Sequence, residues 1–157
     1  MKVPLSRLRR IYGCSEIVLT ILDRTFAISD LLSEQGSHML AGGLAPRGEI
    51  CGQLWGALMA AGAYTNKQIG TKGEELVNAV ALRAGSRLCT EFSDPAGSVD
   101  CRDVCGIDLN ERWGMLRYIL SGKLYGCAKL VKGITHLALP CRERGYVRAP
   151  YLVCLRH

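Results

Sequence analysis

Eight cysteines are the residues of this sequence best suited to chemistry. They are Cys14, Cys51, Cys89, Cys101, Cys105, Cys127, Cys141 and Cys154. Thiolates bind zinc and iron–sulfur clusters, and paired thiols exchange with disulfides. The basic N-terminal stretch lacks a small-residue cleavage site, so we expect a cytoplasmic protein, in a compartment where structural disulfides are rare. So many cysteines in such a protein indicate metal, cluster or redox chemistry.

Cys51 lies near the start of the most uniform stretch of the chain, residues 48–64, which carries no charge after Glu49. We expect a buried helix there. Gly52 and Gly56 are four residues apart, so they share one face and admit another helix or a bulky ligand. In the first helical turn, backbone N–H groups and the positive end of the helix dipole favour a thiolate. The stretch therefore predicts a helix whose N-terminal turn presents a cysteine.

Three other cysteines also sit near expected helix ends. Cys101 and Cys105 are four apart and face one way on a helical turn that Gly106 is suited to end. Cys127 is expected to open a helix that runs through Leu139. Cys89 lies inside a long helical pattern, where we predict that it packs as a core residue.

Helical spacing of apolar residues recurs along most of the chain. It predicts helices over residues 8–26, 29–39, 48–64, 73–92, 113–120 and 127–139. Ser15 followed by Glu16 is an alternative N-terminus of the first helix, with Gly13 as the break before it. Residues 94–98 and Pro140 are expected to break the pattern. We therefore predict one compact all-α domain of about five or six helices over residues 1–139. The Arg-rich tail, residues 140–157, is expected to be irregular apart from a short strand at residues 151–155.

Composition narrows the function classes. The chain has 157 residues, 48% of them hydrophobic and 22% charged, as in one ordinary globular domain. No apolar segment reaches the roughly 18–20 residues of a membrane span. The net charge of +6 is scattered without a nucleic-acid signature, and a solvated basic surface would suit an acidic partner. The absence of phosphate-loop, dinucleotide and nucleophile–base motifs favours a redox accessory protein over a catalyst.

The order of these motifs resembles a known family. Gly13-Cys14 opens a helix, the Gly42-Gly43 loop follows, then Cys51-Gly52 with Gly56, a cysteine after a breaker and a late cysteine before a helix. This pattern is similar, over residues 13–139, to the C_GCAxxG_C_C family of redox-active proteins, which resembles a domain of the split-Soret cytochromes. One departure is Gln53, which stands where the family has alanine and puts a polar amide close to the site.

The resemblance implies a bound redox group, an iron–sulfur cluster of the [2Fe–2S] or [4Fe–4S] type. The family's four cysteines correspond here to Cys14, Cys51, Cys101 and Cys127, with Cys105 as the alternate ligand. The glycines that would give the group room are Gly42, Gly43, Gly52 and Gly56. An acidic redox partner protein and a homodimer that shares the cluster are further expectations.

Three alternatives stay open. Four thiolates also suit a structural zinc ion, although zinc usually takes its ligands in close pairs. A thiol–disulfide couple could use Cys101 with Cys105, or Cys51 with a partner. The last alternative is a helical interaction module whose cysteines are core residues.

Overall fold

The computed structural model describes residues 13–28 and 31–138 as a helical bundle. Its elements are α1 (Cys14–Phe26), α2 (Leu31–Gly36), the 3-10 helix η1 (Ser37–Leu40), α3 (Gly52–Ile69), the 3-10 helix η2 (Gly70–Lys72), α4 (Glu74–Ala96), α5 (Cys101–Cys105), α6 (Gly114–Leu120) and α7 (Lys123–Ala138). These residues form no strand, and the one β-type pairing among them is an isolated antiparallel bridge between Ile50 and Asp100. The prediction of an all-α protein is confirmed. The helix count exceeds five or six because the predicted turn at Cys101–Cys105 is a helix of its own.

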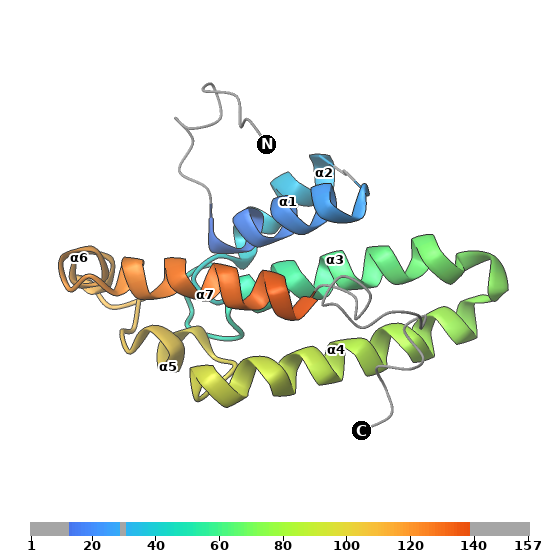
Figure 1. Cartoon of the computed structure of the whole chain (residues 1–157). Helices are drawn as coiled ribbons and strands as arrows, with labels where there is room; N and C mark the ends of the chain where they lie inside the picture. The colour runs from blue at the N-terminus through green and yellow to red at the C-terminus, as the bar shows by residue number, and fades with distance from the viewer. Residues whose placement is uncertain (1–12, 29–30, 139–157) are drawn as a thin grey trace.

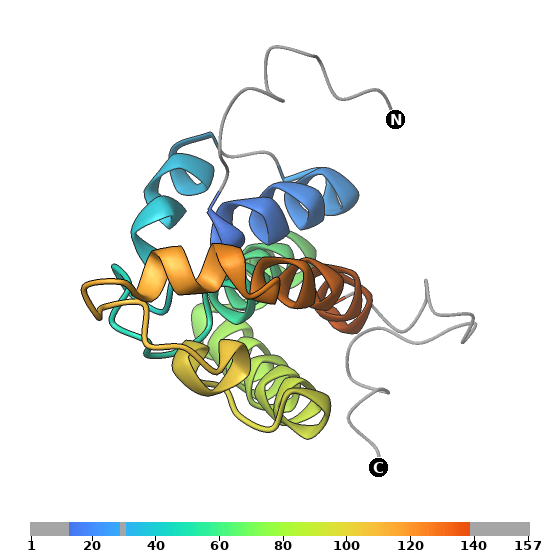
Figure 2. The ribbon, with the colours of Figure 1, turned by 90° about the vertical axis from the view of Figure 1, so that its left-hand side faces the viewer.

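Helices α3 and α4 form a long antiparallel hairpin on which α1 and α7 pack (Figure 1). Helix α1 lies along α3, and α7 lies against α1, α3 and α4. The starts of α1, α3 and α7 and the short helices α5 and α6 gather at one end of the bundle, which faces the viewer in Figure 2. This end collects residues that are far apart in the sequence.

The core lies between α1, α3, α4 and α7. Its largest fully enclosed apolar side chains are Leu19, Leu22, Leu54, Phe92 and Ile134. They recur at helical spacing on amphipathic helices, so their burial supplies the main apolar contribution to folding. The Nζ atom of Lys67, near the end of α3, donates to the carbonyl oxygens of Phe26 and Ala27 at 3.0 and 2.7 Å. This contact joins the C-terminal ends of α1 and α3.

Several predicted helix boundaries were wrong, and among them α3 runs on to Ile69 instead of ending at Tyr64. Helix α3 begins at Gly52 rather than Gly48, because residues 48–51 are drawn out alongside residues 99–102. Helix α4 continues through Pro95, and Gly97, with φ of +78°, ends it instead. Helix α7 begins at Lys123, so Cys127 lies one turn inside the helix rather than at its start. The predicted helical residues 8–12, 29, 30 and 139 and the tail with its strand lie outside the described residues.

Helices α1 and α3 approach closely at Gly56. A Cβ atom on this residue would lie 2.4 Å from the carbonyl oxygen of Ser15, which is shorter than any real contact allows. Glycine costs helix stability locally, but here it lets two backbones touch. None of the helices in the described part of the chain has the length and hydropathy that a membrane crossing requires.

The two glycines Gly56 and Gly62 of α3 give a matched test of this contact. We expect Gly56→Ala to lower the free energy of unfolding by about 1–3 kcal/mol through overpacking against α1. A Cβ atom on Gly62 would meet no atom within 4 Å, so Gly62→Ala should raise the free energy of unfolding by about 0.5–1 kcal/mol. Urea unfolding of both variants measures the difference. Equal effects of the two substitutions would contradict the close α1–α3 contact.

Candidate functional site

Five cysteines meet at the end of the bundle where the helix starts gather. We call them the thiol site: Cys14, Cys51, Cys101, Cys105 and Cys127. Cys14 is the first residue of α1 and Cys51 the N-cap of α3, while Cys101 and Cys105 are the two ends of α5. The sulfur atoms lie close enough for each thiolate to raise the pKa of its neighbours. All four predicted ligands and the alternate one are therefore together.

Two paired backbone segments hold Cys51 beside Cys101. The Cys51 N–H donates to the Val99 carbonyl oxygen at 2.7 Å, and the Cys101 N–H donates to that of Glu49 at 2.7 Å. These bonds flank the Ile50–Asp100 bridge. Because side chains alternate sides along extended backbone, both cysteines fall on the same side of the pairing. A side-chain hydrogen bond joins the two sulfur atoms.

That hydrogen bond shifts the pKa values of the two thiols in opposite directions. The hydrogen bond from Cys101, helped by the N–H groups of Gln53 and Leu54 at the start of α3, lowers the pKa of Cys51 from 9.0 to about 7 against the opposing effect of burial. The same hydrogen bond, together with burial, raises the pKa of Cys101 well above its ordinary value. The two residues therefore favour a state with one proton between them. Cys51 tends to be the thiolate, and the Cys101 thiol donates to it.

Cys14 and Cys127 complete the predicted set, and burial raises the pKa of both thiols. The backbone N–H of Gly42 opposes this for Cys14. For Cys127 the opposing group is the phenol of Tyr118, which hydrogen-bonds to the sulfur, and the Lys123 ammonium adds to it. Tyr118 was not found by sequence reasoning, because nothing in α6 marks it before the helix is placed against α7.

The remaining two described cysteines behave differently. Cys105 is buried, and its thiol donates to the carbonyl oxygen of Ile107 at 3.1 Å. Cys89, on α4, is half-buried against the core, and only burial shifts its pKa upward. Core packing of Cys89 agrees with the prediction. Cys141 and Cys154 lie outside the described residues.

Glycines make room for the thiols. A Cβ on Gly52 would lie 2.7 Å from the sulfur of Cys14, and one on Gly43 would lie 2.7 Å from the Cβ of Cys101. Gly42 has φ of +71°, which aims its N–H at Cys14. Gly56 instead contacts the α1 backbone. At these positions side chains would displace a cysteine or a helix.

Gln53 ties α3 to α7 within the site. Its side chain is 2% exposed, and its Nε2 atom donates to the Cys127 carbonyl oxygen at 2.7 Å. Its Oε1 atom is buried without a hydrogen-bond partner. The polar amide expected near the site is thus in contact with a ligand candidate, and its free oxygen is an acceptor facing the interior.

A single metal ion does not find a ready site. Across residues 13–28 and 31–138, no three His, Cys, Asp or Glu side chains are placed to hold one ion. Tetrahedral zinc with Zn–S bonds of about 2.3 Å needs its sulfur atoms about 3.8 Å apart. An iron–sulfur cluster distributes its thiolates over several iron atoms, so it accepts a more open set. The donor set fits a cluster in kind, number and convergence.

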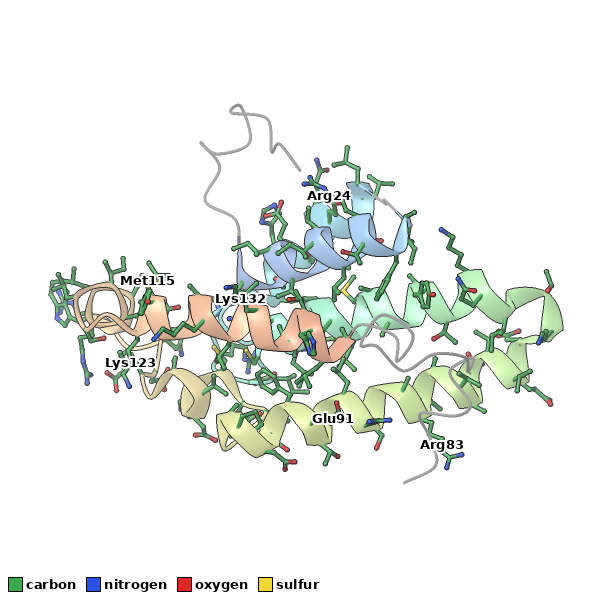
Figure 3. The ribbon with its side chains drawn as sticks, viewed as in Figure 1. Arg24, Arg83, Glu91, Met115, Lys123 and Lys132 are labelled. Carbon is green, nitrogen blue, oxygen red and sulfur yellow. The ribbon has the colours of Figure 1, made fainter. Side chains whose placement is uncertain are left out.

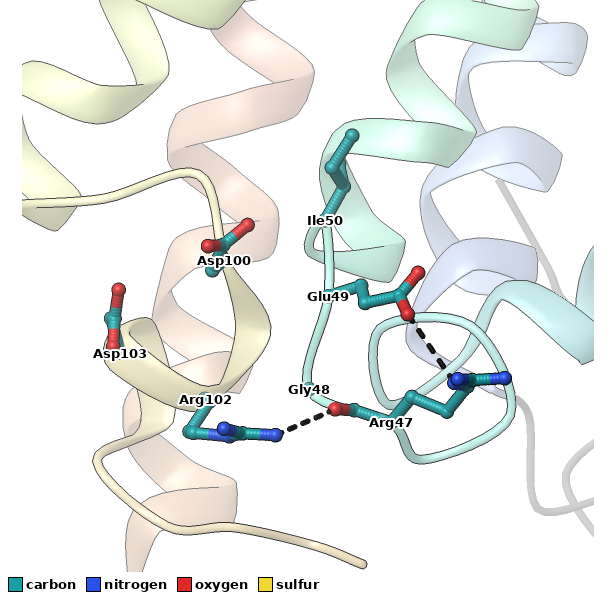
Figure 4. A pocket seen from close by; sticks show the side chains of 7 residues that line it. All are labelled: Arg47, Gly48, Glu49, Ile50, Asp100, Arg102 and Asp103. Carbon is teal, nitrogen blue, oxygen red and sulfur yellow. Dashed lines mark hydrogen bonds and ion pairs between the residues drawn. The ribbon is translucent and has the colours of Figure 1, made fainter.

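A shallow pocket of about 440 Å³ lies on the outer side of the paired segments. Its lining is Arg47, Gly48, Glu49, Ile50, Asp100, Arg102 and Asp103 (Figure 4). Arg47 pairs with Glu49 at 3.3 Å, and Arg102 donates to the Arg47 carbonyl oxygen at 3.0 Å. The Arg102 bond fastens the loop before α3 to α5, beside the pairing that holds Cys51 next to Cys101.

The shared proton of Cys51 and Cys101 predicts a pH dependence for the reduced, metal-free protein. The folded pKa of Cys51 lies below its unfolded value of 9.0, so its thiolate contributes stability above pH 9 that is lost as pH falls through about 7. We expect the stability of the wild type relative to Cys51→Ser to rise by about 1 kcal/mol from pH 7 to pH 8. Urea unfolding at each pH, with ultraviolet thiolate absorbance, measures this; parallel profiles would contradict it.

Comparison with known proteins identifies the family of this chain. The sequence model of a family described as "Putative redox-active protein (C_GCAxxG_C_C)" matches residues 12–139. A protein of Archaeoglobus fulgidus, named "Uncharacterized protein", is 33% identical over 87 residues, which are 50% of this chain and 56% of that protein. The match thus spans little more than half the length of that relative. No solved structure gives a significant match. Since the family match takes in most of the sequence, this chain belongs to the C_GCAxxG_C_C family.

Proposed function

We propose that this protein transfers electrons through an iron–sulfur cluster held by four thiolates of the thiol site. The ligands in this proposal are Cys14, Cys51, Cys101 and Cys127. The observation that carries it is their convergence, from four separate segments, at one end of the bundle, where Cys51 and Cys101 are buried and Cys14 and Cys127 half-buried. A family described as redox-active agrees with this role.

The surroundings of the sulfurs suit such a cluster. When bound, the cluster would supply a one-electron couple. The chain contributes backbone N–H donors from Gly42, Gln53 and Leu54 and the Lys123 ammonium, which stabilise negative charge on sulfur. Burial of the thiols excludes water. Binding must also release protons, because burial keeps most of these thiols protonated beforehand.

The test begins with protein purified without oxygen or reconstituted with iron and sulfide. We expect broad visible absorption with iron and sulfide in similar amounts. Serine substitution of any of the four proposed ligands should remove at least half of the bound iron. Cys89→Ser is the matched control and should keep it all, because Cys89 lies on α4 apart from the thiol site.

Cys105→Ser decides the ligand set. We expect it to retain the cluster, because the Cys105 thiol is already bonded to the Ile107 carbonyl. If Cys105→Ser loses iron while the serine variant of one of the four proposed ligands keeps it, Cys105 takes the place of that ligand in the set. Full iron in all four single variants, or a colourless protein with about one zinc per chain, would reject the proposal.

A second candidate function rests on the hydrogen bond between Cys51 and Cys101. This pair could act as a dithiol without metal. The Cys51 thiolate would attack a small-molecule disulfide and release one thiolate as a mixed disulfide forms. The Cys101 thiol, losing its proton, would then displace the second thiol, so two cysteines are oxidised and one disulfide is reduced.

Glutathione disulfide provides the test for the metal-free protein. We expect mass spectrometry to find a loss of two hydrogens in the wild type, with a peptide link between Cys51 and Cys101. Cys101→Ser should stop at the mixed disulfide on Cys51, and Cys89→Ser should behave as the wild type. A mixed disulfide that persists in the wild type would contradict this second function.

A further inference from the structure

Helix α6 carries an apolar face that the described chain leaves uncovered. We call it the α6 face: Trp113, Met115, Leu116, Ile119, Leu120 and Leu124. Their exposed fractions run from 48% for Leu116 to 76% for Leu120. The first five lie at helical spacing along α6 and its N-cap, and Leu124 lies just beyond them at the start of α7. On the opposite side, Gly114 and Tyr118 face inward, and a Cβ on Gly114 would lie 2.1 Å from the Asp108 carbonyl oxygen. Apolar patches of this kind on small proteins mark interaction sites.

The α6 face forms the outer wall of the thiol site. Tyr118 reaches inward from α6 to hydrogen-bond the sulfur of Cys127. Lys123 follows α6 directly, lowers the Cys127 pKa, and its Nζ atom lies 3.4 Å from where a Gly106 Cβ would be. Figure 3 shows Met115 and Lys123 at this end of the molecule. Whatever binds the α6 face therefore lies beside Cys127.

The rim of the α6 face is basic. Its charged side chains are Glu111, Arg112, Arg117, Lys123 and Lys129, all exposed. The one carboxylate is already paired with the Arg117 guanidinium at 2.9 Å. Two of the cations lie over aromatic rings, Arg112 at 5.7 Å from the Trp113 ring centre and Lys129 at 4.6 Å from that of Tyr125. These contacts hold positive charge around an apolar centre.

The charge of each possible binding partner decides which of them fits the α6 face. Residues 1–12 carry Lys2 and three arginines without an acid, and residues 139–157 carry four arginines against one glutamate. Neither end complements a basic rim. A second copy of the chain would bring the same positive rim against it, and like charges across an interface cost affinity. An acidic protein satisfies both the apolar centre and the rim.

We propose that the α6 face is the docking site of an acidic one-electron carrier protein, with electrons passing by way of Cys127. This proposal rests on the proposed function for its electron step and on the α6 face for its binding step. An iron–sulfur cluster in the reduced protein gives up one electron and becomes oxidised, while the carrier gains that electron. Association should be fast and sensitive to salt, because exposed charges steer it.

The test uses the full chain and two acidic carriers with different cofactors as probes, a flavodoxin and a plant-type ferredoxin. Calorimetry at low salt, with and without the iron–sulfur cluster, measures binding, and stopped-flow absorbance measures electron transfer. We expect micromolar binding to at least one carrier, weakened about tenfold by Leu120→Asp or by Arg112→Glu with Lys129→Glu, and by salt. Arg83→Glu, on α4 at the far end of Figure 3, should stay within twofold of wild type.

The controls separate this proposal from the proposed function. Circular dichroism and iron content of each variant report folding and loading independently of binding. A protein that binds a carrier but holds no iron would leave the docking site standing while the proposed function fails. Absence of binding to both carriers by an iron-loaded wild type would overturn the docking site. So would a salt-resistant dimer in sedimentation that Leu120→Asp dissociates, because a second copy would then cover the α6 face.

Discussion

The contact between α1 and α3 is the constraint on which the rest of this structure depends. Two glycines, Gly52 and Gly56, let the helices approach until backbone meets backbone and the Cys14 sulfur meets the start of α3. Any side chain at these positions would push α1 away and carry Cys14 with it. The packing of α7 against both helices then places Cys127 at the same end. These glycines lower the local helix propensity, but the close packing that they allow fixes the positions of thiols that are distant in the sequence.

Burial and the N–H groups at helix starts have opposite effects on the thiol pKa values within the thiol site. Burial raises the thiol pKa values, which favours protonated, neutral sulfur. Backbone N–H groups at the start of α3, with the donor Cys101, reverse this effect for Cys51 alone. The reduced site therefore offers one thiolate and several thiols that need a cation or oxidation to lose their protons. Such a site couples ligand binding to proton release.

Helix α6 links this chemistry to the surface. Its inward side chain Tyr118 hydrogen-bonds Cys127, while its outward stripe is apolar and has a basic rim. An isolated helix of seven residues is not stable in water, so α6 depends on its few contacts and on any protein that covers it. The exposed apolar stripe and the inward hydrogen bond are consequently properties of one short, weakly held element.

The sequence by itself determined the helical class, the face of Gly52 and Gly56 that follows Cys51, the turn with Cys101 and Cys105, and the family pattern of four cysteines. These features depend on local periodicity or on short motifs, which a linear pattern records. Only the tertiary structure decided that Cys105 joins the four family cysteines in the thiol site, and that Cys127 lies one turn inside α7. Such facts depend on contacts between distant segments, whose packing no local pattern encodes.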